Sequence, residues 1–347
     1  MQATLCSRLA SRPHLAAAGL AVLVSLLTIA VAVALDLPIR DPDGIAGPAL
    51  VRLPLILALM FAIDVVPRGI RRARGLRGAR ASIAAVTRER WSRRSLVLVL
   101  VGLVSFYLTY VSYRNLKSFL PFVRERTADG LLLDLEPGLL LGEEPAMMLH
   151  DLLGTGLVAE FLSPVYVFFL VFVPLSLGAA LVWTRDLARG FWYVTALGVN
   201  WVLGAASYYL VPSLGPVFVR PSLYAELPAT SVSQLQETLL SERLQVLADP
   251  HATQALHGVA GFASLHVAIV FSAAIIAQLA GVRPALRRAL WAFFWLTTIS
   301  TMYFGWHYMI DVLAGLVIGL VAVAAGAVAT GHAVSLRPAL HEQAKAA

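Results

Sequence analysis

Residues 306–329 read WHYMIDVLAGLVIGLVAVAAGAVA, and this stretch decides the fold class of the chain. Beyond Asp311 it carries no charge, and it is long enough for an α-helix to cross the roughly 30 Å hydrocarbon core of a bilayer. Similar apolar stretches lie at about 15–35, 49–66, 95–113, 161–183, 191–211, 264–281 and 289–305. The sequence therefore predicts an all-α fold, a polytopic membrane helix bundle with about eight transmembrane helices.

The composition of the whole chain excludes an ordinary soluble domain. Of the 347 residues, 59% are hydrophobic and 14% are charged, and the mean hydropathy is +0.77. A soluble fold of this size does not need so much apolar surface. The net charge of +7 owes most to an arginine-rich stretch, residues 68–94, which suits a loop beside anionic lipid headgroups. We therefore expect the lipid bilayer as a partner and no nucleic acid.

Lysine and arginine are distributed unevenly between the connecting segments. With the N-terminus inside, 19 of the 27 lie in inner segments and 7 in outer segments. By the positive-inside rule, both termini are predicted to be cytoplasmic in a multi-pass protein of the cell membrane. The helices that begin near residues 264 and 310 then start at the extracytoplasmic face.

Two outer segments are too long to be simple turns. Residues 114–160 mix apolar and acidic side chains, which favours helices lying in the membrane interface. Residues 234–247 carry leucines at helical spacing and predict an amphipathic helix that caps the outer surface. Near the N-terminus, Cys6 is the single cysteine, so no internal disulfide is expected. The first apolar stretch is interpreted as an uncleaved helix, with signal-peptide cleavage as the alternative.

Two histidines at the outer ends of apolar helices are the candidate chemical groups. His307 and Asp311 are four residues apart and so lie on one face of a helix. An ionisable pair within a membrane span is costly and by default marks a functional site. The carboxylate can hold the tautomer of the imidazole, while His266, at the start of 264–281, can supply or remove a proton. Both histidines lie at predicted helix N-termini, which favour an anion such as phosphate.

Two other interpretations of these residues stay open at this point. Two histidines and a carboxylate can bind zinc, so a metal site is the chemical alternative. The neighbouring Trp306 and Tyr308 also suit ordinary aromatic anchors at a membrane interface.

The motifs around the histidines resemble a known family. Ser264-Leu265-His266, followed by His307-Tyr308 and Asp311, is similar to the type 2 phosphatidic acid phosphatase superfamily, closest to its inositol phosphorylceramide synthase-like branch. Further similarities are Tyr209-Leu210-Val211-Pro212, Gly215-Pro216 and Thr301-Met302-Tyr303. The resemblance implies a reaction without metal or cofactor on a phospholipid or polyprenyl phosphate. It implies that His307 forms a phosphohistidine, Asp311 orients His307, and His266 protonates the leaving oxygen.

The chain departs from the phosphatase pattern at two positions where the phosphatases have a cationic side chain. Ser213 stands where the phosphatases have lysine, and Thr301 where they have arginine. This loss favours the synthase-like branch and a donor phosphate with a single negative charge. The candidate substitutes and further phosphate contacts are Arg220, Arg114, Lys117, Ser264 and Tyr308. For the three cations, headgroup contact or snorkelling is the alternative.

These expectations divide the chain into four parts. Residues 1–113 form N-terminal transmembrane helices with a basic cytoplasmic loop, 114–160 an outer interfacial segment, 161–330 the catalytic transmembrane core and 331–347 a cytoplasmic tail. The predicted function is phosphotransfer between a lipid and an acceptor at the extracytoplasmic face. Hydrolysis by the same site is the alternative, and a non-catalytic transporter or scaffold is disfavoured because the sequence shows no internal repeat. The oligomeric state is left open.

Overall fold

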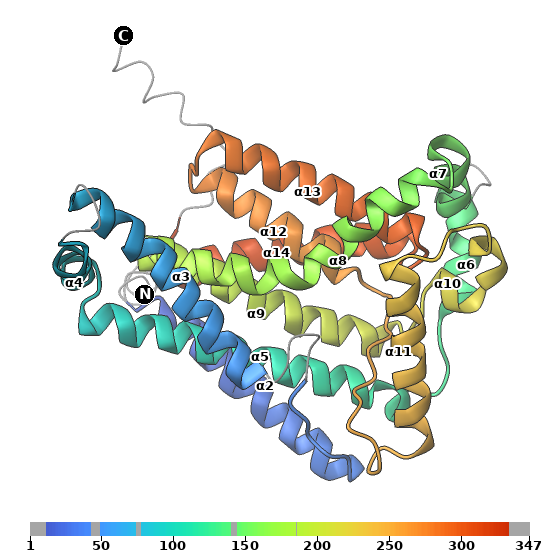
Figure 1. Cartoon of the computed structure of the whole chain (residues 1–347). Helices are drawn as coiled ribbons and strands as arrows, with labels where there is room; N and C mark the ends of the chain where they lie inside the picture. Colours follow the sequence, from blue (N-terminus) through green and yellow to red (C-terminus); the bar gives the residue numbers. More distant parts are fainter. Residues whose placement is uncertain (1–11, 43–48, 74–77, 140–143, 185, 333–347) are drawn as a thin grey trace.

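The fold is all-helical, as the sequence predicts. The computed structural model describes residues 12–42, 49–73, 78–139, 144–184 and 186–332 (Figure 1), so Cys6 and most of the 331–347 tail lie outside the described residues. Within these ranges the chain forms thirteen α-helices and no strand. They are α2 His14–Leu35, α3 Ala49–Arg72, α4 Ala79–Arg90, α5 Arg93–Val123, α6 Asp129–Leu139, α7 Pro145–Leu153, α8 Leu157–Gly178, α9 Leu187–Leu210, α10 Pro216–Val219, α11 Ser231–Ala248, α12 Leu265–Leu279, α13 Pro284–Tyr303 and α14 Met309–Thr330.

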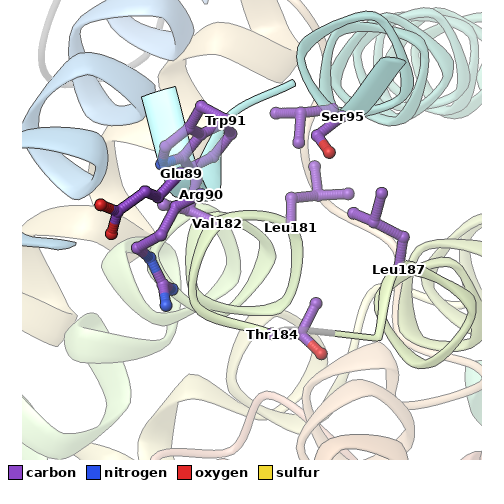
Figure 2. Close-up of a pocket in the computed structure, with 9 residues that line it drawn as sticks. Glu89, Arg90, Trp91, Ser95, Leu181, Val182, Thr184 and Leu187 are labelled. Atoms are coloured by element: carbon purple, nitrogen blue, oxygen red, sulfur yellow. The ribbon is translucent and has the colours of Figure 1, made fainter. Parts of the chain in front are cut away.

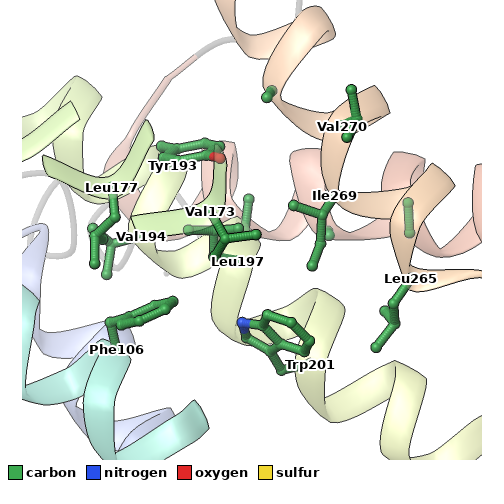
Figure 3. Close-up of a cluster of buried hydrophobic side chains, with 14 of the residues drawn as sticks. Phe106, Val173, Leu177, Tyr193, Val194, Leu197, Trp201, Leu265, Ile269 and Val270 are labelled. Atoms are coloured by element: carbon green, nitrogen blue, oxygen red, sulfur yellow. The ribbon is translucent and has the colours of Figure 1, made fainter. Parts of the chain in front are cut away.

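Helix α9 lies at the centre of the bundle and packs against α2, α5, α12 and α14 (Figure 1). Figure 3 shows part of the resulting core, where Phe106 of α5, Leu197 and Trp201 of α9, and Ile269 of α12 face one another. Some polar groups in this core are paired across helices: the Trp192 indole donates to the Val323 carbonyl over 2.9 Å. The core thus holds helices from both halves of the sequence together.

The predicted number of membrane spans was wrong. Each of the eight apolar stretches lies in a helix, but only four helices in the described parts of the chain are long and apolar enough to be candidate spans: His14–Leu35, Arg93–Val123, Leu157–Trp183 and Met309–Thr330. Helix α12 has 15 residues and is about 22 Å long, shorter than the hydrocarbon core of roughly 30 Å. The apolar stretch at 191–211 lies in α9. It is apolar because α9 is buried between neighbouring helices, and this environment also accommodates Asn200 and small residues. These four candidates indicate an integral multi-pass membrane protein.

The outer segments are helical, as expected. Helices α6 and α7 lie within 114–160, and α11 covers the amphipathic stretch at 234–247. Helix α11 begins with a capping box, in which Thr230 and Ser233 each accept from the other's backbone N–H. It lies across the end of the bundle near α5 and α10 (Figure 1). Their location in the membrane interface stays a prediction.

Helix α5 continues to Val123 instead of ending near residue 113. Arg114 and Lys117 therefore lie in its last turns and not in a loop.

Glycines bring together α12, which carries His266, and α14, which begins two residues after His307. A Cβ at Gly315 of α14 would come within 2.5 Å of the Ser264 carbonyl oxygen, and one at Gly319 within 2.9 Å of the Ala268 carbonyl oxygen. Because Gly lacks a Cβ, α14 can approach α12 this closely. The Ser264 backbone N–H donates to the Asp311 carbonyl over 3.0 Å, which places the N-terminal ends of both helices side by side.

Candidate active site

His307 and Asp311 meet at the start of α14, but the prediction that one helix carries both residues was wrong: α14 begins at Met309 with Tyr308 as its N-cap, so His307 lies in the turn just before the helix. Asp311 Oδ2 accepts from the Tyr308 backbone N–H over 3.0 Å and lies 3.3 Å from His307 Nδ1. Asp311 is 0% exposed and His307 is 6% exposed. An ionised carboxylate can only accept, so this contact places the imidazole proton on Nδ1 and leaves the lone pair on Nε2. His307 thus has the tautomer that a nucleophile needs.

His266 lies in the first turn of α12, directly after its N-cap. Ser264 forms this cap, and its hydroxyl oxygen accepts from the Val267 N–H over 3.4 Å. The His266 and His307 ring centroids are 5.8 Å apart. From α8, Tyr166 stacks on His266 at 4.7 Å and Phe169 lies at 4.2 Å, which fixes the ring. A phosphate bonded to one imidazole can therefore have an oxygen within hydrogen-bond reach of the other.

Two buried carboxylates of α6, which the sequence reasoning missed, hold the loops around His307. Asp129 accepts from the Gly215 N–H and from the Tyr308 hydroxyl, both over 3.0 Å. Glu136 accepts from the Met309 N–H over 2.7 Å, and burial raises the pKa of Glu136 to about 7. The sequence offered one signal for them, because Asp129 and Glu136 are seven residues apart within one predicted helical segment.

Arg220, one of the predicted phosphate ligands, is engaged elsewhere. It follows α10 and forms an ion pair with Glu144, just before α7, and its side chain is 47% exposed. Within the described residues, no hydrogen bond or ion pair joins Arg220 to either histidine, so the structure does not bring Arg220 together with them. Arg114 and Lys117 lie in α5, where Arg114 Nη1 is 3.4 Å from the Tyr110 hydroxyl and Lys117 Nζ is 5.1 Å from the centroid of the Tyr208 ring. In the described part of the chain, neither forms a hydrogen bond or ring contact with the histidines.

The two positions that lack the expected cations have structural roles. The Ser213 hydroxyl oxygen accepts from the Phe262 N–H over 2.8 Å, which ties the loop after α9 to the segment before α12. Thr301 is fully buried, and its carbonyl accepts from the Trp306 N–H over 2.9 Å in the turn that leads to His307. Both residues therefore stabilise the backbone around the site.

A cavity of about 350 Å³ lies far from the histidines, between the start of α5, the end of α8 and the start of α9 (Figure 2). Its lining includes Arg90, whose guanidinium is already paired with buried Asp64 at 2.8 Å. Along α5, Ser95 in this lining is roughly 33 Å from Lys117, at 1.5 Å per residue. This cavity does not serve the candidate site.

The comparison with protein families matches residues 131–325 to the PAP2 superfamily. The chain belongs to the PAP2 superfamily. The matched region runs from α6 into α14 and contains His266, His307 and Asp311. Comparison with curated proteins and with solved structures gave no match. Membership suggests a phosphatase-type membrane enzyme acting on phosphate esters, and it does not distinguish the branches of the superfamily.

Removing metal ions is expected to leave turnover unchanged. Asp311 Oδ2 already serves His307 Nδ1 and the Tyr308 N–H, and no set of three metal-ligating side chains gathers in the described part of the chain. The measurement is the turnover rate after dialysis against EDTA, with and without added zinc. Loss of activity on dialysis and its return with zinc would make the metal-site interpretation correct.

Proposed function

We propose that this protein is a phosphotransferase that moves a phosphoryl or phospho-headgroup from a lipid donor to an acceptor through a phosphohistidine on His307. The observation that carries this proposal is the constellation of His307 Nδ1 on Asp311 with the His266 ring 5.8 Å away. One imidazole has a free lone pair for attack, and a second is close enough for proton transfer. Membership of the PAP2 superfamily supports the same chemistry.

In the first half-reaction, His307 Nε2 attacks phosphorus and the bond from phosphorus to the leaving oxygen breaks. Burial lowers the pKa of His266 well below its usual value, but the negative charge of a bound phosphate favours the imidazolium. His266 therefore starts the reaction protonated and donates its proton to that oxygen. In the second half-reaction, the neutral His266 accepts the proton of the acceptor hydroxyl. The acceptor oxygen then attacks the phosphohistidine, which releases His307 and restores both imidazoles.

The phosphate group has several candidate ligands. The first turns of α12 and α14 present backbone N–H groups without intrahelical partners, which favour anions. Ser264 can donate its hydroxyl hydrogen while its oxygen caps α12, and we retain Arg114 and Lys117 as cationic ligands. The Tyr308 hydroxyl donates to Asp129, so we assign Tyr308 to holding the start of α14. Arg220 can bind the phosphate group only if its ion pair with Glu144 opens.

The location of the reaction is part of the proposal. The arginine distribution supports a cell-membrane protein with the histidines on the extracytoplasmic side. The resemblance of the motifs around Ser264 and His307 supports the inositol phosphorylceramide synthase-like branch.

Transfer is expected to outpace hydrolysis when a suitable alcohol is supplied. Helices α6, α7 and α11 cover the end of the bundle where the site lies (Figure 1), and a covered site protects a reactive intermediate from water. The experiment incubates purified protein in lipid nanodiscs with labelled phospholipid and polyprenyl-phosphate donors, with and without candidate alcohols, and identifies the products. Efficient release of inorganic phosphate, unaffected by every alcohol tested, would instead identify a lipid phosphate phosphatase.

A further inference from the structure

The turn at residues 303–309 carries the chain from α13 through His307 into α14, and helices that bear neither histidine hold it. These are α6, α7, α10 and α11, here called the capping helices, which lie at one end of the bundle (Figure 1). Three consecutive carbonyls of the turn accept hydrogen bonds from three of them: Tyr303 from the His150 imidazole of α7 over 2.9 Å, Phe304 from the Gln236 amide of α11 over 2.8 Å and Gly305 from the Val217 N–H of α10 over 2.9 Å. A carbonyl oxygen can only accept, so the capping helices supply the donors.

The fourth capping helix, α6, holds the other side of His307. The Tyr308 hydroxyl donates to Asp129 over 3.0 Å, and the Met309 N–H donates to Glu136 over 2.7 Å. All four capping helices thus bracket the nucleophile, with bonds to three residues before it and to two residues after it.

The turn needs these partners because its own chain satisfies it only in part. The last four carbonyls of a helix have no partner within the helix. In α13, three of the four accept from N–H groups of the turn, and the fourth, that of Tyr303, accepts from His150. Beyond the helix, Gly305 has a φ of +67°, a left-handed conformation that favours glycine. The conformation of the turn therefore depends on the docking of the capping helices.

Helix α11 is seated against this turn by packing as well. Val232 is fully buried, and its N–H donates to the Ser163 hydroxyl oxygen of α8 over 3.3 Å. Leu235 packs against the buried cluster that contains Val232, Phe304 and Trp306. This packing fixes α11, so the amide of the residue after Leu235 meets the Phe304 carbonyl from a defined position.

Helix α7 docks on the same turn through both ends of one tyrosine. The His150 and Tyr303 ring centroids are 4.7 Å apart, and His150 is 6% exposed. The Tyr303 hydroxyl donates to the Gly154 carbonyl, directly after α7, over 2.8 Å. The end of α13 and the end of α7 are therefore bonded in both directions.

We propose that Gln236 and His150 are positioning residues for the nucleophile, because they hold the turn that sets where His307 lies relative to Asp311 and His266. The inference rests on the proposed function and deepens it, since it makes the capping helices part of the catalytic geometry. Asp311 fixes the imidazole proton on Nδ1, but the reach of Nε2 depends on the backbone at position 307. A misplacement of about 1 Å can slow a reaction by on the order of 10²-fold. Loss of one bond to the turn should therefore slow phosphotransfer without weakening donor binding.

Gln236→Met is expected to lower kcat about tenfold or more, while the KM for a labelled lipid donor changes less than about twofold. Methionine keeps the length and packing of the side chain but has no donor for the Phe304 carbonyl. Gln236→Lys supplies an N–H donor of similar reach and should restore part of kcat. Gln234→Met, at an exposed position of the same helix, is the matched control with unchanged kcat.

His150→Leu and His150→Gln test the second bond in the same way. Leucine removes the donor, whereas glutamine retains an N–H for the Tyr303 carbonyl, so the Leu variant should lose more kcat than the Gln variant. Thermal unfolding shows that the variants compared are folded. Wild-type kcat in folded Gln236→Met and His150→Leu variants, or a loss confined to KM, would overturn the proposal.

A measurement that needs no turnover separates the positioning role from the proposed function. NMR of protein with ¹⁵N-labelled histidine in nanodiscs observes the Nδ1–H that His307 shares with Asp311, and the signal is identified by its loss in His307→Ala. Gln236→Met should shift or broaden this signal, whereas Gln234→Met should leave it at the wild-type position. A changed signal in a protein without phosphotransferase activity would leave the positioning role standing and remove the proposed function. An unchanged signal in Gln236→Met, with wild-type turnover intact, would do the opposite.

Discussion

Replacing His307 by Ala is expected to reduce turnover to the uncatalysed background, a loss of at least about 10⁴-fold, because the variant has no group to accept the phosphoryl group. The variant removes Nε2, which is the atom that the Asp311 contact leaves free for attack. The measurement is the initial rate of product formation with a labelled lipid donor in nanodiscs. His251→Ala is the matched control, since His251 is an exposed histidine in the loop after α11.

The same comparison tests the covalent intermediate. After rapid quenching in base, wild-type protein should carry the label from the donor in an acid-labile form, which is typical of phosphohistidine. His307→Ala should carry none, and His251→Ala should match the wild type. Labelled protein from the His307 variant would contradict the assignment of His307 as the nucleophile, even if its turnover were low.

Replacing His266 by Ala is expected to slow transfer from natural lipid donors by about 10²–10⁴-fold, the range for loss of a positioned general acid. An alkoxide is a poor leaving group and needs the proton, whereas 4-nitrophenolate leaves without one. Phosphohistidine formation from a 4-nitrophenyl phosphate ester should therefore be affected much less.

The leaving-group comparison separates proton transfer from packing. His266 is held between Tyr166 and Phe169, so the variant also removes an aromatic contact. A purely structural role would slow both classes of donor equally. Equal losses with the lipid and the 4-nitrophenyl donor would thus contradict the role of His266 as an acid, and thermal unfolding would show whether packing is responsible.

The sequence predicted the helical class and the helix at 310–329, because these depend on apolar length. It predicted the contact of His307 with Asp311 but not its geometry, since His307 lies in the turn before α14. It also predicted the amphipathic helix that became α11. It did not predict the number of candidate spans, since an apolar stretch can be buried by neighbouring helices as well as by lipid. Helix α9 is the clear case, with Phe191, Leu197 and Asn200 all fully buried within the bundle.

The contacts of the cations in α5 and α11 could not be predicted from the sequence. Arg114 and Lys117 were candidates because they could replace the two cations missing at Ser213 and Thr301, whereas Arg243 is the one cation of the amphipathic helix α11. Its position beside His257 depends on how the chain returns from α11 to α12. The carboxylates Asp129 and Glu136 were missed for the same reason, because their partners are backbone N–H groups far along the chain.

By itself, then, the sequence determined what short-range patterns control: a membrane-embedded helical chain, a candidate pair of side chains at the start of α14 and a second histidine at the start of α12. The tertiary structure alone decided which distant groups share the site. Glycines at 315 and 319 let α14 approach α12, and that approach brings the two imidazoles to 5.8 Å. The docking of α6 adds the buried carboxylates of Asp129 and Glu136. Such contacts depend on packing between elements far apart in the chain, which no local pattern encodes.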